Sequence, residues 1–125
     1  RGLRGGFDVA TFYDTAGNDT LSNNPVNGQV NFANAAGLFL QALNFERVKV
    51  IASAGGAVDR AFLNDTAGND FFLGNGPDGT LFSPTTVLQT SLFDAVSITG
   101  TTGTNTFTTT NLSYQFARNG SWTQV

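Results

Sequence analysis

Apolar and polar residues alternate along several short stretches of the chain. In the segment 47–51, Arg-Val-Lys-Val-Ile, the side chains of Val48 and Val50 fall on one face. Val96 and Ile98 share a face in the same way further along the chain. A period of two residues is typical of β-strands that bury one face. These stretches end at clusters of Gly, Asn, Pro and Asp, so the pattern predicts short strands joined by turns.

The composition favours an all-β fold. The 125 residues include 12 Phe and 15 Gly but no Met, and Glu46 and Lys49 are the single residues of their types. Met, Glu and Lys form helices readily because they lose little side-chain entropy there, whereas Thr, Val and Phe favour strands. We therefore expect strands in more than about 35% of the residues, above the usual share, and no helix longer than two turns.

A repeat is visible in the chain. The string Asp-Thr-Ala-Gly-Asn-Asp stands at 14–19 and again at 65–70, an offset of 51 residues, and Asp8 matches Asp59 at the same offset. The string is absent from the end of the chain. We divide the single predicted domain, residues 1–125, into repeat 1 (1–51), repeat 2 (52–102) and a partial terminal repeat or cap (103–125).

Short strands in a unit of about 50 residues favour a parallel β-helix, or β-solenoid, of about two and a half repeats. Equivalent residues of such a fold stack in interior columns with a spacing of about 4.8 Å per rung. We therefore expect Phe12 to share a column with Leu63, and Leu21 to share one with Phe72. The alternative is a β-sandwich whose two halves arose by duplication.

The repeated string also carries candidate metal ligands. The run Gly-Asn-Asp-Thr-Leu at 17–21 resembles the core of the hemolysin-type (RTX) calcium-binding nonapeptide, G-G-x-G-x-D followed by an apolar residue. The resemblance implies Ca²⁺ ligation by Asp14 and Asp19 in the first copy, and by Asp65 and Asp70 in the second.

Two departures from the nonapeptide predict weak calcium binding at most. The leading Gly-Gly is missing and the motif does not recur directly afterwards, whereas Ca²⁺ takes six to eight oxygen ligands. The simpler hypothesis is structural: Asp14 and Asp65 begin Asx-type turns, and Gly17 and Gly68 adopt positive φ.

A longer pattern extends the resemblance. The segments 45–48, 54–56, 59–61 and 65–70 are similar to a repeat that occurs in tandem in very large bacterial surface proteins, and the likeness spans most of residues 7–104. It implies a bacterial protein at the cell surface or outside the cell, with a structural or adhesive role. It implies no catalytic residue.

Charge and residue types exclude several functions. The net charge is −3 without a basic stripe, which argues against nucleic-acid binding. No apolar run approaches the roughly 18 residues of a membrane span, so no membrane insertion is expected. The chain has no His and no Cys, and hence lacks the commonest general base and nucleophile. We expect no enzyme and no cofactor apart from calcium; a carbohydrate-active β-helix enzyme is the least favoured alternative.

Modification and assembly give the last predictions. Four Asn-x-Ser/Thr sequons make candidate glycosylation sites of Asn18, Asn64, Asn111 and Asn119. A short solenoid has an unpaired strand at each end, so copies of the chain are expected to join head to tail into an extracellular filament. Phe116, Trp122 and Val125 are the candidate junction residues. The alternative is a calcium- or glycan-binding adhesin module, with surface glycans as partners.

Overall fold

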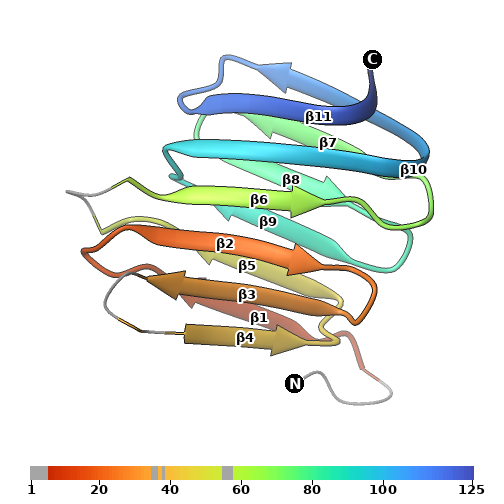
Figure 1. Cartoon of the computed structure of the whole chain (residues 1–125). Coiled ribbons are helices and arrows are strands. Elements are labelled where there is room, and N and C mark those ends of the chain that lie inside the picture. Colours follow the sequence, from red (N-terminus) through yellow and green to blue (C-terminus); the bar gives the residue numbers. More distant parts are fainter. Residues whose placement is uncertain (1–5, 35–36, 38, 55–57) are drawn as a thin grey trace.

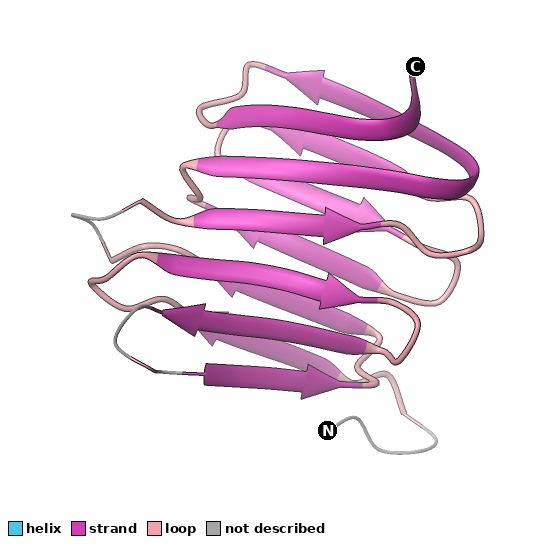
Figure 2. Cartoon of the chain, viewed as in Figure 1, coloured by secondary structure: helices cyan, strands magenta, loops and turns pink. Residues whose placement is uncertain are grey.

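The computed structural model describes residues 6–34, 37, 39–54 and 58–125. Of these residues, 64% lie in strands and none lies in a helix, which confirms the all-β prediction (Figure 2). The strands are β1 (Val9–Tyr13), β2 (Asp19–Asn24), β3 (Gln29–Asn34), β4 (Phe39–Leu43), β5 (Arg47–Ile51), β6 (Arg60–Asn64), β7 (Phe71–Asn75), β8 (Asp78–Phe82), β9 (Val87–Ser91), β10 (Ala95–Thr110) and β11 (Gln115–Gln124).

The strands form one sheet that folds over into two facing layers (Figure 1). The hydrogen-bonded order is β1-β5-β9-β8-β7-β10-β6-β2-β3-β4, and β11 pairs with β10. The first half of β10 pairs with β6 and its second half with β7, because the strand bends around Gly100 and Asn105. We call the layer of β4, β3, β2, β6 and the first halves of β10 and β11 the front layer. The back layer contains β1, β5, β9, β8, β7 and the second half of β10.

Equivalent strands of the two copies lie in opposite layers. In each copy a single strand precedes an antiparallel meander of three strands, which is β2-β3-β4 in the front layer and β7-β8-β9 in the back layer. Phe12 and Leu63 therefore lie in different layers, as do Leu21 and Phe72. The predicted shared columns are wrong for this reason.

We call one passage of the chain around the two layers a coil. Strand pairs between successive coils are parallel, as in β1-β5-β9 and β2-β6-β10. The meanders add antiparallel pairs, so the sheet is mixed. Turn-forming residues cause this difference from a purely parallel coil: Gly28 and Gly76 adopt φ of 68° and 56° in the turns that close β2-β3 and β7-β8. Glycine permits this conformation without steric cost, and the chain turns back within its own layer.

The apolar core lies between the layers. Val48, Val50, Val96 and Ile98 are all buried, as their alternation predicts. Phe72 is fully buried, and its ring stacks on that of Phe116 with centroids 5.2 Å apart. Residues far apart in the sequence therefore close one core across the two layers.

A core substitution tests this arrangement. We expect Phe72→Ala to lower the free energy of unfolding by about 3–5 kcal/mol, because it removes a buried ring and leaves a cavity. Phe62→Ala is the matched control: Phe62 is 44% exposed on the front layer, and its loss should cost less than about 1 kcal/mol. Urea unfolding followed by Trp122 fluorescence measures both values, and equal losses would contradict the two-layer core.

Candidate functional site

The repeated string forms a corner between layers in both copies. Residues 14–19 connect β1 with β2, and residues 65–70 connect β6 with β7. Each string stacks on the corner of the following coil. We call residues 14–19 with 52–54 and 58–59 the first corner, and residues 65–70 with 100–105 the second corner. The two corners lie at opposite lateral edges of the sheet (Figure 1). The first string leads from the back layer to the front layer, whereas the second leads from the front layer to the back layer.

Within each string, the last Asp holds the loop closed. The carboxylate of Asp19 accepts the backbone N–H of Thr15 at 2.8 Å and its hydroxyl at 3.1 Å. Thr15 Oγ1 in turn accepts the N–H of Gly17 at 3.4 Å. Thr66 and Asp70 repeat this arrangement. The prediction of positive φ at Gly17 and Gly68 is wrong, because the threonine hydroxyl closes the turn without that conformation.

The other polar side chains of the first corner bond to the neighbouring coil. The Asp14 carboxylate accepts the backbone N–H of Ala54 at 2.9 Å, and Asn18 Oδ1 accepts that of Val58 at 2.8 Å. In the opposite direction, Asp59 Oδ1 accepts the N–H of Asp19 at 2.9 Å. The predicted local Asx-type turn at Asp14 is therefore replaced by a bond between coils.

The second corner repeats these bonds with different residues. Asp65 accepts the backbone N–H groups of Thr101 and Thr102 at 2.8 and 3.1 Å. Asn105 Oδ1 accepts the N–H of Asp70 at 3.1 Å, and so takes the part that Asp59 plays in the first corner. The side chains of Asp65, Asp70, Asp59 and Asn105 are all at most 3% exposed.

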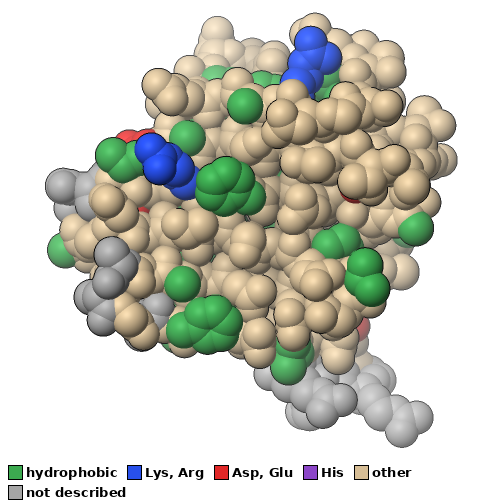
Figure 3. Space-filling view, viewed as in Figure 1, with side chains coloured by type: hydrophobic (Ala, Val, Ile, Leu, Met, Phe, Trp, Pro, Cys, Tyr) green, Lys and Arg blue, Asp and Glu red, His purple; other side chains and the backbone are tan. Residues whose placement is uncertain are grey.

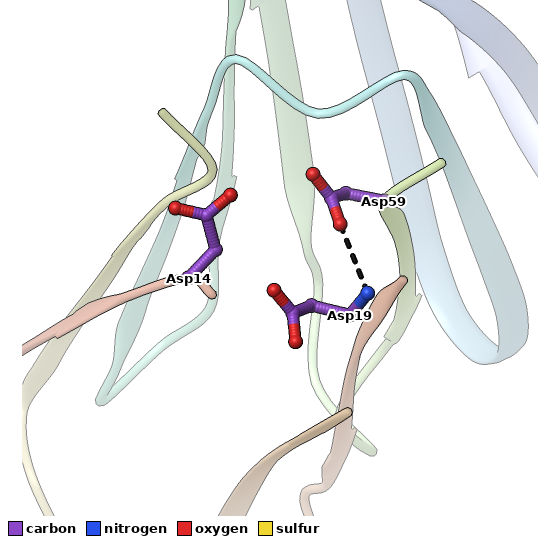
Figure 4. Close-up of side chains that lie close together, drawn as sticks. All are labelled: Asp14, Asp19 and Asp59. Carbon is purple, nitrogen blue, oxygen red and sulfur yellow. Dashed lines mark hydrogen bonds between the residues drawn. The ribbon is translucent and has the colours of Figure 1, made fainter. Parts of the chain in front are cut away.

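The corners differ in one functional group. The Asn105 amide donates to Asp65 Oδ2 at 2.9 Å. The equivalent Asp59 offers a second carboxylate oxygen instead, and the carboxylates of Asp14, Asp19 and Asp59 lie within 4.8 Å of one another (Figure 4). Three acids thus meet at the first corner, where the second corner has two acids and an amide.

The pKa values follow this difference. Burial raises the pKa of Asp59, the Asp19 N–H opposes this, and the nearby carboxylates of Asp14, Asp19 and Asp94 raise it further. Burial alone would also raise the pKa of Asp65. Hydrogen bonds from Thr101, Thr102 and Asn105 more than offset the burial, and the pKa of Asp65 lies below its ordinary value.

The two predicted pairs of calcium ligands lie in different surroundings. Asp14 and Asp19 lie together with Asp59, and carboxylate oxygens are the ligands that Ca²⁺ prefers. Both oxygens of Asp14 and one of Asp59 already accept backbone N–H groups. Beside Asp65 and Asp70, the Asn105 amide places a hydrogen-bond donor among the acids. Calcium therefore stays a prediction, and the first corner is the better of the two places for it.

The candidate glycosylation sites differ in their surroundings. Asn18, Asn111 and Asn119 are exposed, and the Asn119 amide donates to Ser97 Oγ at 3.2 Å. The Asn64 amide donates to the backbone carbonyl of Asn23 at 2.8 Å. A glycan on Asn64 would leave its amide nitrogen a single N–H for that bond.

The candidate junction residues also differ in burial. Trp122 is only 7% exposed, whereas Val125 is 68% exposed. Phe116 is half-buried, and its ring lies against those of Phe72 and Phe107. Phe116 and Trp122 thus close the core at the end formed by β11, and Val125 extends from it.

A cavity of about 550 Å³ lies between the turn 25–28 of the front layer and the turn 83–87 of the back layer. Its lining includes amide and hydroxyl side chains together with Phe45 and Glu46. The volume falls in the range of small-ligand sites, and the glycan-binding alternative would use it.

Comparison with known proteins gave no relative. No protein-family model matches the chain, and neither a curated protein nor a solved structure matched it. The described residues contain no helix long and apolar enough to cross a membrane.

The first corner yields a test of charge. Because the folded-state pKa of Asp59 is raised, its contribution to stability is present at low pH and is lost as pH rises through that value. Asp59→Asn removes the charge, keeps the acceptor for the Asp19 N–H and supplies a donor for Asp14. We expect the free energy of unfolding at pH 7 to rise by about 1 kcal/mol, and the gain to shrink below about pH 4.

The second corner supplies the reciprocal control. Asn105→Asp builds three carboxylates there and should lower stability at pH 7 by a similar amount. Thermal melts across pH measure both variants, and a loss of stability in Asp59→Asn would contradict the interpretation. The same melts with millimolar calcium or chelator test the calcium prediction, since only corners with three carboxylates should respond.

Proposed function

We propose that the chain is an extracellular structural module, a β-solenoid of repeats that stacks end to end with further copies into a filament. The observation that carries the proposal is that both ends of the two-layered sheet present open strands with matching directions. β4 and β1 form one end, and β11 with the second half of β10 forms the other. Among the described residues each end strand is paired on one side only.

Strand direction favours a simple translation between copies. In the front layer, β4 runs the same way as β2, β6 and the first halves of β10 and β11. In the back layer, β1 runs the same way as β5, β9, β7 and the second half of β10. A second copy shifted along the stack would therefore pair β4 with β11, and β1 with the end of β10 and β11, all in parallel.

The register of the junction follows from columns that cross each layer. The back-layer column is Val9-Arg47-Val87-Phe82-Phe71-Thr106-Thr123. The front-layer column is Phe39-Ala33-Thr20-Arg60-Ala95-Gln115. One further rung of the same spacing places Val9 of a second copy beside Thr123, and Phe39 of that copy beside Gln115.

Surface properties support this contact. Val9 and Phe39, on the end strands β1 and β4, are 52% and 57% exposed. Burying such a side chain fully contributes about 1.5–3 kcal/mol. Few charged side chains lie on the front face of the molecule (Figure 3).

A proline on the free edge of β1 tests the proposal. Asp14 donates its N–H to the carbonyl of Ile51, and Asp8 accepts the N–H of Arg47. Backbone groups alternate in direction along a strand, so those of Thr11 point to the free edge. We expect Thr11→Pro to abolish polymers and to leave the melting temperature of the monomer nearly unchanged, because edge positions tolerate proline.

Thr11→Val, which keeps the N–H and a similar shape, is the control and should assemble. Sedimentation velocity and electron microscopy over a range of concentrations report the outcome. Filaments of Thr11→Pro equal to those of the unchanged chain would contradict the edge contact. An unchanged chain that stays monomeric at every concentration would remove the proposal.

A disulfide tests the register. The chain has no Cys, so Val9→Cys with Thr123→Cys introduces the only thiols, and these lie at opposite ends of the sheet (Figure 1). Adjacent rungs bring Cα atoms within the range of about 4.4–6.8 Å that a disulfide needs. We expect oxidation to give ladders of covalent oligomers on a non-reducing gel. Val9→Cys with Gln115→Cys joins opposite layers, and equal ladders from this control would exclude the register.

A further inference from the structure

Asp8 carries a buried carboxylate oxygen, Oδ2, that has no hydrogen-bond partner among the residues that the structure describes. The residue directly precedes β1 at the open end, and its backbone N–H donates to Glu46 Oε2 at 2.8 Å. Asp59 has the same relation to Asp94, with its N–H at 2.8 Å from Asp94 Oδ2. Asp8 is therefore the structural as well as the sequence equivalent of Asp59.

The equivalents of Asp8 accept a hydrogen bond from the neighbouring coil. Asp59 Oδ1 accepts the N–H of Asp19 at 2.9 Å, and Asn105 Oδ1 accepts that of Asp70 at 3.1 Å. In each case the donor and the acceptor stand one residue before two residues that pair in the sheet. Asp19 precedes Thr20 and Asp59 precedes Arg60, and Thr20 pairs with Arg60. Asp70 precedes Phe71 and Asn105 precedes Thr106, and Phe71 pairs with Thr106. Asp8 has the acceptor, but among the described residues no strand lies on that side.

The same rule identifies the donor at a junction. The successor of Asp8 is Val9, whose column ends at Thr123, so the donor is the N–H of Trp122. Val125 donates its N–H to the carbonyl of Phe107. By alternation, Thr123 also faces β10 and the N–H of Trp122 points away from it.

We propose that the Asp8 carboxylate of one copy accepts the backbone N–H of Trp122 from a second copy, and thereby sets the register of the stack. The inference rests on the proposed function and names the residues of its junction.

Two substitutions of Asp8 test the bond in the full chain. Asp8→Ala removes the acceptor and should weaken association about tenfold or more. Asp8→Asn keeps an acceptor oxygen, as Asn105 does in the second corner, and should assemble like the unchanged chain. The monomer should melt at the same temperature or higher in Asp8→Ala, since the Asp8 carboxylate has no hydrogen bond to another described residue that would be lost. Asp59→Ala, which breaks the equivalent internal bond, should melt lower.

Hydrogen exchange gives a direct readout. The amide of Trp122 should become protected in polymers of the unchanged chain, and should exchange faster in polymers of Asp8→Ala formed at higher concentration. Sedimentation velocity supplies the association midpoints for each variant.

The outcomes separate this inference from the proposed function. Equal association of Asp8→Ala and the unchanged chain, with Thr11→Pro still inactive, would overturn the inference alone. Asp8→Asn as weak as Asp8→Ala would overturn it too, because the charge rather than the acceptor would then matter. Protection of the Thr11 amide, which points to the free edge of β1, in the monomer would mean that another segment occupies this end, and would also overturn it. A chain that never assembles would overturn both proposals.

Discussion

The fold depends on how backbone N–H groups are satisfied where the chain crosses between layers. The backbone of a strand forms hydrogen bonds with the neighbouring strands, whereas the backbone of a corner has no such strand to pair with. Buried N–H groups without partners destabilise the fold. At both corners, side-chain oxygens of one coil accept the N–H groups of the next: Asp14 and Asn18 bond to Ala54 and Val58, and Asp65 bonds to Thr101. The repeated string is thus a device that joins successive coils.

Either a carboxylate or an amide oxygen can accept a backbone N–H group at a corner, and the choice between the two sets the number of acids there. Asp59 and Asn105 accept equivalent N–H groups, so either residue completes the hydrogen bonds between coils. Only the amide also has a donor, which Asn105 directs at Asp65. The first corner therefore carries one more carboxylate than the second. Burial and the neighbouring acids raise the pKa of Asp59, whereas hydrogen bonds hold the pKa of Asp65 in the second corner below its ordinary value.

The sequence predicts the fold only as far as local signals reach. Alternation identifies the inward faces, since Val48, Val50 and Val96 are buried, and composition predicts the all-β class. A turn signal does not reveal whether the chain reverses within a layer or crosses to the other one, so the meanders and the exchange of layers were missed. At the site, the string reveals Asp14 and Asp19, and Asp59 gives a weaker signal by matching Asp8. Asn105 gives none, because it follows Asp59 by 46 residues in a copy that has lost the string.

The arrangement of the corner bonds decides what kind of assembly the module can form. Within the chain, the preceding coil of each corner contributes Asp14 or Asp65 as an acceptor and the N–H of Asp19 or Asp70 as a donor, and the following coil contributes the complementary groups. The two sides of a coil are therefore not equivalent. One end of the sheet consequently carries the acceptor Asp8, and the other carries the outward N–H of Trp122. Two identical ends placed together would not offer the N–H of Trp122 to either Asp8 carboxylate. Unlike ends are complementary, and a contact between unlike ends related by translation does not close on itself. The complementarity of unlike ends therefore favours an open filament over a symmetric dimer.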